Sequence, residues 1–209
     1  MRAHFRWIAA TLGVALTVSP MAGSAQIAGK ADLRVFGEAQ PVPRSEVKAG
    51  PEITRLLHEL SGTWSISEEL APDASSPKGK TGKGTIIWRP GPGGFSVLEE
   101  YRSQQGDDEI GGLGVFWWDE AAHGYHTIWC DSTNPGGCIE FKNVVRWEGS
   151  TLVLQEDYEV KGRKYTFKEV FGDIRQDSFT QTLYSGDMGG ALKVDQIIRG
   201  KRMKESSRP

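Results

Sequence analysis

Cysteine is scarce in this sequence, and neither basic residues nor long apolar segments are in excess. The 209 residues include two Cys, and two thiols without a third and fourth ligand nearby make a poor metal site. Lys and Arg number 25 against 27 Asp and Glu, with both signs interspersed, so the net charge is -2. Because no basic stripe is available to neutralise a phosphate backbone, we expect no nucleic-acid partner.

Sequence signatures of common catalytic and cofactor sites are also missing. There is no Gly-x-Ser-x-Gly nucleophile elbow, and the Gly-Lys-Gly at 82–84 lacks the glycine spacing of a phosphate loop. No His follows His126, so a haem iron would need His58, His123 or His126 as its ligand. His123 and His126 would point to opposite faces of a strand, which disfavours a shared metal. We therefore assign no catalytic residue, metal ligand or cofactor.

The first residues have the layout of an export signal. Arg2 and Arg6 precede a mostly apolar run from Trp7 to Ser19, and small side chains lead up to Ala25. The run is shorter than the roughly 20 apolar residues that span a bilayer. We predict a signal peptide over residues 1–25, cleaved after Ala25, and a mature protein in the periplasm or the medium without a membrane span. A short amphipathic or membrane-anchoring helix is the alternative for this segment.

The composition after the signal predicts a single domain between two short flanking segments. Residues 26–50 lack steady periodicity and contain Pro and Gly, so we expect a flexible N-terminal arm there. Apolar residues then follow at helical spacing within Pro51–Leu60, which predicts a short amphipathic helix that caps the domain. We place the domain at residues 51–203 and a disordered tail at 204–209.

Period-two alternation of apolar residues recurs through the rest of the chain, interrupted by Gly, Pro, Asn and Asp. The expected strands are Gly62–Leu70, Gly82–Arg89, Gly94–Ser103, Gly112–Asp119, Gly124–Asp131, Gly137–Glu148, Thr151–Val160, Arg163–Ile174, Ser178–Ser185 and Ala191–Arg202. Hairpin signals between most neighbours indicate an antiparallel meander. An open sheet would leave two exposed edges, and closure removes both. We therefore predict an all-β fold: a single antiparallel meander β-barrel of about ten strands, with its first and last strands paired and a short N-terminal capping helix.

The two cysteines flank a segment of turn-forming residues. Cys130 and Cys138 are separated by Asp131–Gly137, which would bring the ends of two antiparallel strands together. In an oxidising compartment we predict a disulfide between them. Closing so short a loop stabilises a fold by roughly 2.5 kcal/mol. Two free thiols are the alternative.

The more apolar face of each strand gives a predicted barrel interior with an aromatic wall and a few polar groups. The predicted ligand-contacting residues are the wall residues Trp64, Trp88, Phe95, Tyr101, Tyr158 and Phe167 and the polar residues Glu99, Glu156, Glu169 and Gln196. A buried carboxylate is costly, so these Glu residues must be paired, protonated or hydrated.

Two interpretations of this interior stay open. The first is a cavity for a small molecule, which the Glu residues orient. The second is a solid barrel in which the Glu residues pair with Arg89, Arg146 or Lys168, or in which the inward face of one or two strands is assigned wrongly.

Adjacent aromatic residues on a later strand indicate a second surface. Trp117 and Trp118 would face opposite ways in a strand, so one of them would lie outside the barrel, with Phe116 and Trp129 nearby. An exposed patch there would favour weak self-association or a protein partner in the envelope. Coverage by the N-terminal arm or the capping helix is the alternative.

Several short motifs follow one another in a recognisable order. They are Leu60–Trp64, Gly94-Phe95, Glu99–Tyr101, Gly112–Val115, Trp117–Asp119, Thr127–Ser132, Trp147–Leu152 and Tyr165–Phe171. Together they resemble the bacterial lipocalin-like family catalogued as domain of unknown function 1579, over Leu56 to Met203. The resemblance implies a calycin-type antiparallel barrel with a helix at one end, similar to lipocalins and fatty-acid-binding proteins. It brings no established activity and no catalytic residues.

The chain departs from the lipocalin superfamily pattern in two ways. It has about ten expected strands and no clear second lipocalin motif, which leaves the nature of any ligand open. Haem-binding relatives with similar barrels use a late His, which this sequence lacks.

From the sequence, the leading function is noncovalent binding of a small apolar or amphipathic molecule inside the barrel. An envelope interaction module that uses the outer aromatic patch is the second hypothesis. The third is an enzyme that uses an interior Glu as acid or base, although no spacing selects a reacting pair.

Overall fold

The computed structural model describes residues 48–74 and 76–204 of the chain. The predicted signal peptide, nearly all of the predicted arm and the predicted tail beyond residue 204 lie outside these residues. Within the described residues, no helix is long and apolar enough to cross a membrane.

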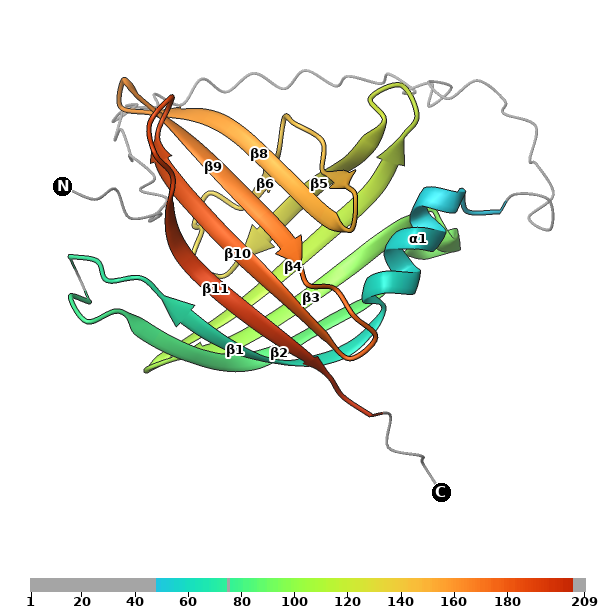
Figure 1. The fold of residues 1–209 in the computed structure, drawn as a ribbon, viewed down its shortest axis with the longest axis horizontal. Coiled ribbons are helices and arrows are strands. Elements are labelled where there is room, and N and C mark those ends of the chain that lie inside the picture. Colours follow the sequence, from blue (N-terminus) through green and yellow to red (C-terminus); the bar gives the residue numbers. More distant parts are fainter. Residues whose placement is uncertain (1–47, 75, 205–209) are drawn as a thin grey trace, which may run out of the picture. The chain divides into compact units, whose positions relative to one another are not determined.

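One short helix precedes a domain made of antiparallel strands (Figure 1). The elements are α1 (Pro51–Leu60), β1 (Gly62–Leu70), β2 (Lys80–Pro90), the 3-10 turn η1 (Pro92–Gly94), β3 (Ser96–Gln105), β4 (Asp108–Asp119), β5 (Gly124–Asp131), β6 (Cys138–Glu140), β7 (Arg146–Glu148), β8 (Thr151–Val160), β9 (Arg163–Gly172), β10 (Ser178–Asp187) and β11 (Lys193–Arg202). The predicted all-β class and the predicted helix are confirmed.

The eleven strands form one antiparallel sheet that curls into a half-barrel. The order across the sheet is β6-β5-β4-β3-β2-β1-β11-β10-β9-β8-β7. The first and last strands, β1 and β11, pair from Trp64↔Arg202 to Leu70↔Gln196. The predicted pairing of the first strand with the last is therefore confirmed. The expected removal of both edges is not, because the sheet keeps an edge at β6 and another at β7.

The two edge strands come from one predicted strand that the structure divides. Instead of a continuous strand over Gly137–Glu148, β6 pairs with β5 and β7 pairs with β8. The strand is interrupted because the backbone N–H of Lys142 donates to Glu156 Oε2 at 2.7 Å instead of to a neighbouring strand. Tyr125 and Val145 exchange two backbone hydrogen bonds, of 2.8 and 2.7 Å, and so connect the β5 side of the sheet to the segment that enters β7. We call this connection the seam.

Apolar side chains fill the end of the half-barrel next to α1. The buried face of α1 consists of Ile53, Leu56 and Leu60. Trp64 meets Phe179 edge-on with 4.9 Å between ring centroids, and Trp88 meets Phe171 at 5.8 Å. This closed end is a solid core, so the space for a ligand lies at the other end.

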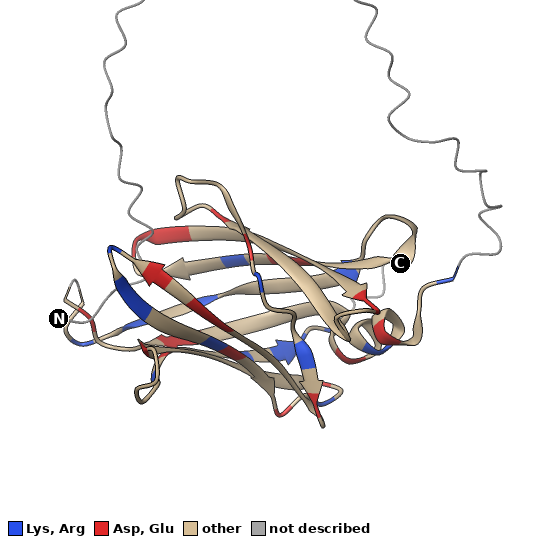
Figure 2. Cartoon of the chain, turned by 90° about the horizontal axis from the view of Figure 1, so that it is seen from above, with Lys and Arg blue, Asp and Glu red and all other residues tan. Residues whose placement is uncertain are grey.

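Lys and Arg are interspersed with Asp and Glu along the strands (Figure 2). Cross-strand ion pairs use some of them, such as Arg89 with Glu100 and Arg199 with Glu69, each at 2.6 Å. Exposed pairs of this kind contribute at most about 1 kcal/mol each. The fold therefore depends on its core and its backbone ladders more than on surface charge.

Candidate functional site

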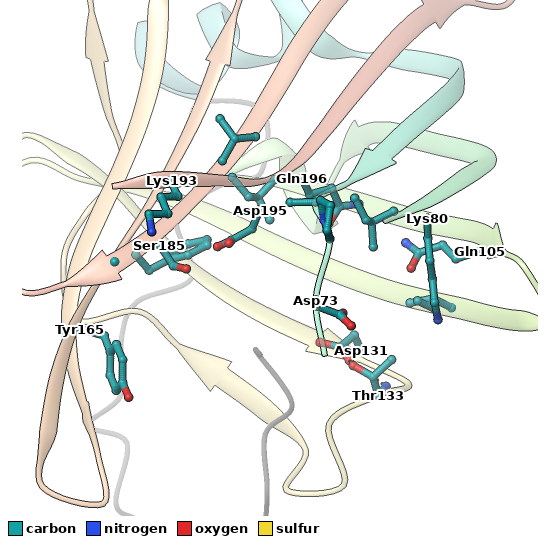
Figure 3. Close-up of a pocket in the computed structure, with 18 of the residues that line it drawn as sticks. Asp73, Lys80, Gln105, Asp131, Thr133, Tyr165, Ser185, Lys193, Asp195 and Gln196 are labelled. Atoms are coloured by element: carbon teal, nitrogen blue, oxygen red, sulfur yellow. Dashed lines mark hydrogen bonds between the residues drawn. The ribbon is translucent and has the colours of Figure 1, made fainter. Parts of the chain in front are cut away.

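A large pocket opens at the end of the half-barrel opposite α1. β1 begins beside α1 at Gly62 and reaches the pocket at Leu70. The volume is about 1530 Å³, above the roughly 300–1,000 Å³ of most small-molecule sites. Figure 3 shows Ser185 and Asp195, from β10 and β11, at one side of the pocket, and Asp131 from the end of β5 at another.

Aromatic side chains form much of the inner wall. Phe141 and Phe167 stack with 6.0 Å between ring centroids, and Tyr158 and Tyr165 stack at 5.5 Å. Trp129 lines the pocket from β5. Aromatic pairs contribute about 0.5–1.5 kcal/mol beyond the area they bury, so these rings hold one another in place. This aromatic part of the wall suits the body of an apolar molecule.

Trp129 is fixed in this wall by its neighbours. The indole Nε1 donates to Asp131 Oδ2 at 2.9 Å. A Cβ at Gly112 would lie 2.4 Å from the indole ring. Only glycine at this position of β4 therefore lets the ring pack against the strand. Tyr101 meets the ring edge-on at 6.0 Å.

Beneath the pocket, the buried carboxylate of Glu68 accepts three side-chain hydrogen bonds. Glu68, 2% exposed, accepts from Tyr101 Oη at 2.5 Å, from Ser103 Oγ at 2.7 Å and from Gln105 Nε2 at 2.8 Å. Burial, followed by the charge of Glu68, raises the pKa of Tyr101, so this phenol stays a hydrogen-bond donor. Gln105 also lines the pocket and links it to this network.

Two further interior carboxyls, Glu99 and Glu169, lack such support. Burial, followed by the negative charge of Glu169, raises the pKa of Glu99 well above its usual value. Burial also raises the pKa of Glu169 to about 7, although Gln181 Nε2 donates to Glu169 Oε1 at 2.5 Å. The interior therefore contains two acids that are hard to ionise together. We call Glu68, Glu99 and Glu169 the interior acids.

The basic residues proposed from the sequence as partners do not reach the interior acids. Arg89 pairs with Glu100, and Arg146 donates to the backbone oxygen of Ala122 at 2.9 Å. Lys168 alternates with the inward-facing residues of β9, so its side chain points outward. The solid barrel with these three ion pairs is therefore excluded.

Two buried polar atoms next to these acids have no hydrogen-bond partner among the described residues. They are Trp88 Nε1 and Gln181 Oε1. Trp88 is the cross-strand partner of Glu99, and Gln181 is bonded to Glu169. Buried polar groups nearly always have partners, so unmet hydrogen bonds here indicate a place for water or a polar ligand group.

In the described part of the chain, no group of three or more His, Cys, Asp or Glu is arranged to hold a metal ion. His126 Nε2 lies 3.0 Å from Asp119 Oδ2 and its ring stacks on Trp117. The backbone N–H of Ala122, followed by the hydrogen bond with His126, lowers the pKa of Asp119. Neither His126 nor Asp119 lines the pocket.

Comparisons with known proteins bear on the fold. No family model matches the chain, and no curated protein matches it. Among solved structures, the S-type phycobiliprotein lyase CPES from Guillardia theta aligns with a TM-score of 0.50 and 11% identity, over 74% of this chain and 94% of that chain. Rv2717c from M. tuberculosis aligns with a TM-score of 0.50 and 10% identity, over 75% of this chain and all (100%) of that chain. The chain shares their barrel fold.

The structure distributes the predicted ligand-contacting residues over three levels. Lining the pocket are Tyr158, Phe167 and Gln196; in the polar layer beneath are Glu99, Tyr101 and Glu169; in the closed end are Trp64 and Trp88. Trp64 and Trp88 are 0% and 1% exposed, so they are core residues. A ligand contact by the residues of the first two levels stays a prediction.

The remaining two predicted ligand-contacting residues do not line the pocket. Phe95 is 45% exposed and does not face the interior. The reason is local: β3 begins only at Ser96, and the backbone of Phe95 is in the right-handed helical region, which breaks the period-two alternation. Glu156, on the inner face of β8, holds the backbone of Lys142 in the segment between β6 and β7.

Sequence reasoning missed Glu68, Ser103 and Gln105. The signal was present for two of them, because extending the inward alternation of β1 and β3 by one step reaches Glu68 and Ser103. Gln105 is one step further and lies beyond the predicted end of its strand. It also assigned Trp129 to an outer patch, whereas its ring lines the pocket.

The second aromatic surface is smaller than predicted. Trp118 packs edge-on against Tyr125 at 5.1 Å, and Phe116 is 6% exposed in the core. Only Trp117 of this group lies on the outer face of β4, half-buried beside His126. Self-association or an envelope partner through this face stays a prediction.

Proposed function

We propose that this protein binds a small apolar or amphipathic molecule in the pocket opposite α1. The observation that carries the proposal is the pocket itself: about 1530 Å³ of space with aromatic walls, in a half-barrel whose other end is solid. An apolar chain that buries about 200 Å² there gains roughly 5 kcal/mol before the costs of association. The polar layer beneath would orient one end of the ligand.

The setting we propose is outside the cytoplasm, and the family we propose is the lipocalin-like one that the motifs resemble. Support for export comes from the leader-like first residues and from the Cys130–Cys138 disulfide, since such bonds persist in oxidising compartments. The barrel architecture supports the family proposal.

Native mass spectrometry of the protein purified from its own envelope tests whether a small molecule occupies the pocket. The expected result is a co-purified species that leaves the protein when it is denatured. A species that the wild-type protein converts with time, and that Glu169→Gln leaves unchanged, would favour acid–base catalysis instead. That second function is favoured by one observation, the pKa of Glu169 of about 7 beside Glu99.

Filling the pocket should abolish binding. Leu183 lines the pocket from β10, and Leu183→Trp places a large ring in the cavity. We expect the affinity for the uncharged dye Nile red, measured by fluorescence titration, to fall by about tenfold or more, a loss of about 1.4 kcal/mol.

The matched control is Leu113→Trp, which makes the same substitution at a position that is 38% exposed. Leu113 does not line the pocket, so dye binding should stay as in the wild type. Equal loss in both variants, or no loss in Leu183→Trp, would contradict the assignment of the pocket.

A further inference from the structure

The interior beneath the pocket has negative groups and no positive ones. Between the pocket lining and Arg202, the inward-facing positions of the described strands carry the interior acids but no Lys or Arg. Arg202 itself is at the closed end, where it donates to the backbone oxygens of Ser61 and Glu59. The interior acids therefore have no basic partner from the chain itself.

The rim of the pocket also has more acidic than basic side chains. Its lining includes seven acidic residues (Asp or Glu) but only three basic ones (Lys or Arg). Two of these three cations are already paired, Lys80 with Asp108 at 3.2 Å and Arg163 with Asp187 at 3.0 Å. A positively charged molecule is attracted to such an opening and a negatively charged one is repelled.

Glu169 lies directly beneath the pocket lining. It is one inward-facing position below Phe167 on β9, a rise of about 7 Å. Its cross-strand partner Leu183 and its neighbour Phe167 both line the pocket. Gln181, which is 6% exposed, donates to Glu169 and leaves its own Oε1 without a partner among the described residues.

We propose that the pocket selects amphiphiles that carry an ammonium group, which Glu169 and Gln181 Oε1 receive just beneath the pocket lining. This inference rests on the proposed function, because it names the ligand class of the same pocket. An ammonium group has three N–H donors, enough to bond both acceptors. Its charge also offsets the repulsion between Glu99 and Glu169, so it is bound by charge-assisted hydrogen bonds.

A carboxylate amphiphile such as a fatty acid is disfavoured by the same groups. Its head would add a further negative charge beside two acids that already resist ionisation together. The three basic residues of the pocket are in its lining, and beneath that lining the described strands offer the head no Arg or Lys short of Arg202 at the closed end. The selectivity therefore comes from repulsion of anions as well as attraction of cations.

Binding of the ammonium group should strengthen as pH rises through about 7, because Glu169 must be ionised to receive it. The ionisable groups on the inner faces of the packed strands are Glu68 on β1, Glu99 and Tyr101 on β3, Glu156 and Tyr158 on β8, and Tyr165 on β9. β10 presents the neutral Gln181 beside Glu169. An alkylammonium stays protonated throughout this range, since its pKa is near 10.

Three probes with the same chain length test the selectivity: dodecylamine, dodecanol and dodecanoate. Each displaces Nile red from the wild-type protein at about pH 8, below its micelle-forming concentration. We expect dodecylamine to bind about tenfold or more tighter than dodecanol, and dodecanoate to bind weakest. The preference for dodecylamine should fall at about pH 6, whereas dodecanol binding should not change.

Glu169→Gln should remove the preference for dodecylamine and leave dodecanol binding in place. Glu159→Gln is the matched control, because it removes the same charge from an exposed residue outside the pocket lining. If Glu169→Gln does not fold, carboxyl-carbon NMR of the wild type replaces it. Dodecylamine should then lower the pKa of Glu169, and dodecanol should not.

The outcomes separate this inference from the proposed function. Equal binding of the three probes, tighter binding of dodecanoate, or an amine preference that survives Glu169→Gln overturns the ammonium assignment and leaves the binding pocket standing. If none of the probes and no Nile red binds, both fail. An amine preference lost in Glu169→Gln and kept in Glu159→Gln supports the assignment.

Discussion

At the scale of single residues, the three interior acids show two ways of placing a carboxyl group inside a barrel. Glu68 accepts three hydrogen bonds from Tyr101, Ser103 and Gln105. Glu99 has no comparable donors among the described residues and meets the charge of Glu169 instead. An acid of the first kind stabilises the fold through its hydrogen bonds. Acids of the second kind destabilise the fold when they ionise, and a ligand can change their ionisation.

Stability should fall as the pH rises through about 7. The folded protein holds a proton on Glu169 up to a pKa of about 7, whereas the ordinary value of 4.5 applies when the chain is unfolded. A raised acid pKa gives stability that is fully present below about 4.5 and is lost by about pH 8. We expect Glu169→Gln, which cannot ionise, to be more stable than the wild type at about pH 8, by at most about 3 kcal/mol.

Urea unfolding of the two proteins at about pH 5 and about pH 8 measures this difference. The gain should be small at the lower pH, where Glu169 is already neutral. Glu159→Gln serves again as the control and should follow the wild type. A Glu169→Gln variant that is less stable than the wild type at both pH values would mean that the ionised carboxylate stabilises the fold.

Residue positions could be predicted only where the strand bounds were right. Glu99 and Glu169 were placed inside because alternation is strict in the middle of a strand. Phe95 was misplaced because the turn at η1 delays β3, and the left-handed backbone of Gly94, with φ of 79°, belongs to that turn. Glu68 was missed although it continues the alternation of Trp64 and Ile66, because the inward set of β1 was ended at Ile66.

At the scale of elements, the β5–β6 hairpin and the seam hold the open side of the half-barrel. Cys130 and Cys138 are cross-strand partners in this hairpin and form a disulfide, as predicted. Trp129 and Ile139, also cross-strand partners, line the pocket beside it. The disulfide therefore supports the wall of the site as well as the edge of the sheet.

Reduction of the disulfide should destabilise the protein by up to roughly 2.5 kcal/mol, the chain entropy of so short a loop. The measurement is the urea midpoint with and without reductant. A Cys130→Ala and Cys138→Ala double variant is the control, because reductant should leave its midpoint unchanged. Thiol titration of unfolded, unreduced protein should find no free sulfhydryl, and two thiols per chain would refute the bond in solution.

Most elements could be predicted because each one has its own local signal. α1, β1, β5 and β8 have the predicted bounds, since Gly or Pro marks their starts and alternation or helical spacing fills them. The division into β6 and β7 could not be predicted. It depends on a hydrogen bond between Lys142 and Glu156, which no local pattern specifies.

At the scale of the whole molecule, the architecture depends on the ladder between β1 and β11. The ladder joins Trp64 to Arg202 and Leu70 to Gln196, across almost the full length of the domain. The pairing of the first strand with the last was predictable because a meander with both of these strands unpaired would expose two edges. The edges at β6 and β7 were not predicted. The location of the pocket was not predictable. The alternation of apolar residues predicts an aromatic lining at both ends and does not distinguish the filled end from the hollow one.

Ending the chain at Leu192, before β11, should prevent folding. The truncation leaves β1 and β10 as exposed edges and removes the buried side chain of Ile198. We expect aggregation and loss of cooperative unfolding, measured by gel filtration and circular dichroism. A chain that ends at Lys204 keeps every described strand and should melt like the full chain. A monomeric, cooperatively melting Leu192 truncation would contradict the role of this ladder.

The distance in sequence between β1 and β11 also governs the order of events when the chain is made. A nascent chain emerges from its N-terminus, so β1 is complete long before the strand that covers its free edge exists. Contacts so far apart in sequence form slowly. Until β11 is made, the free edge of β1 can pair with other chains and cause aggregation. The pairing of β11 with β1 is therefore the step that completes the native fold.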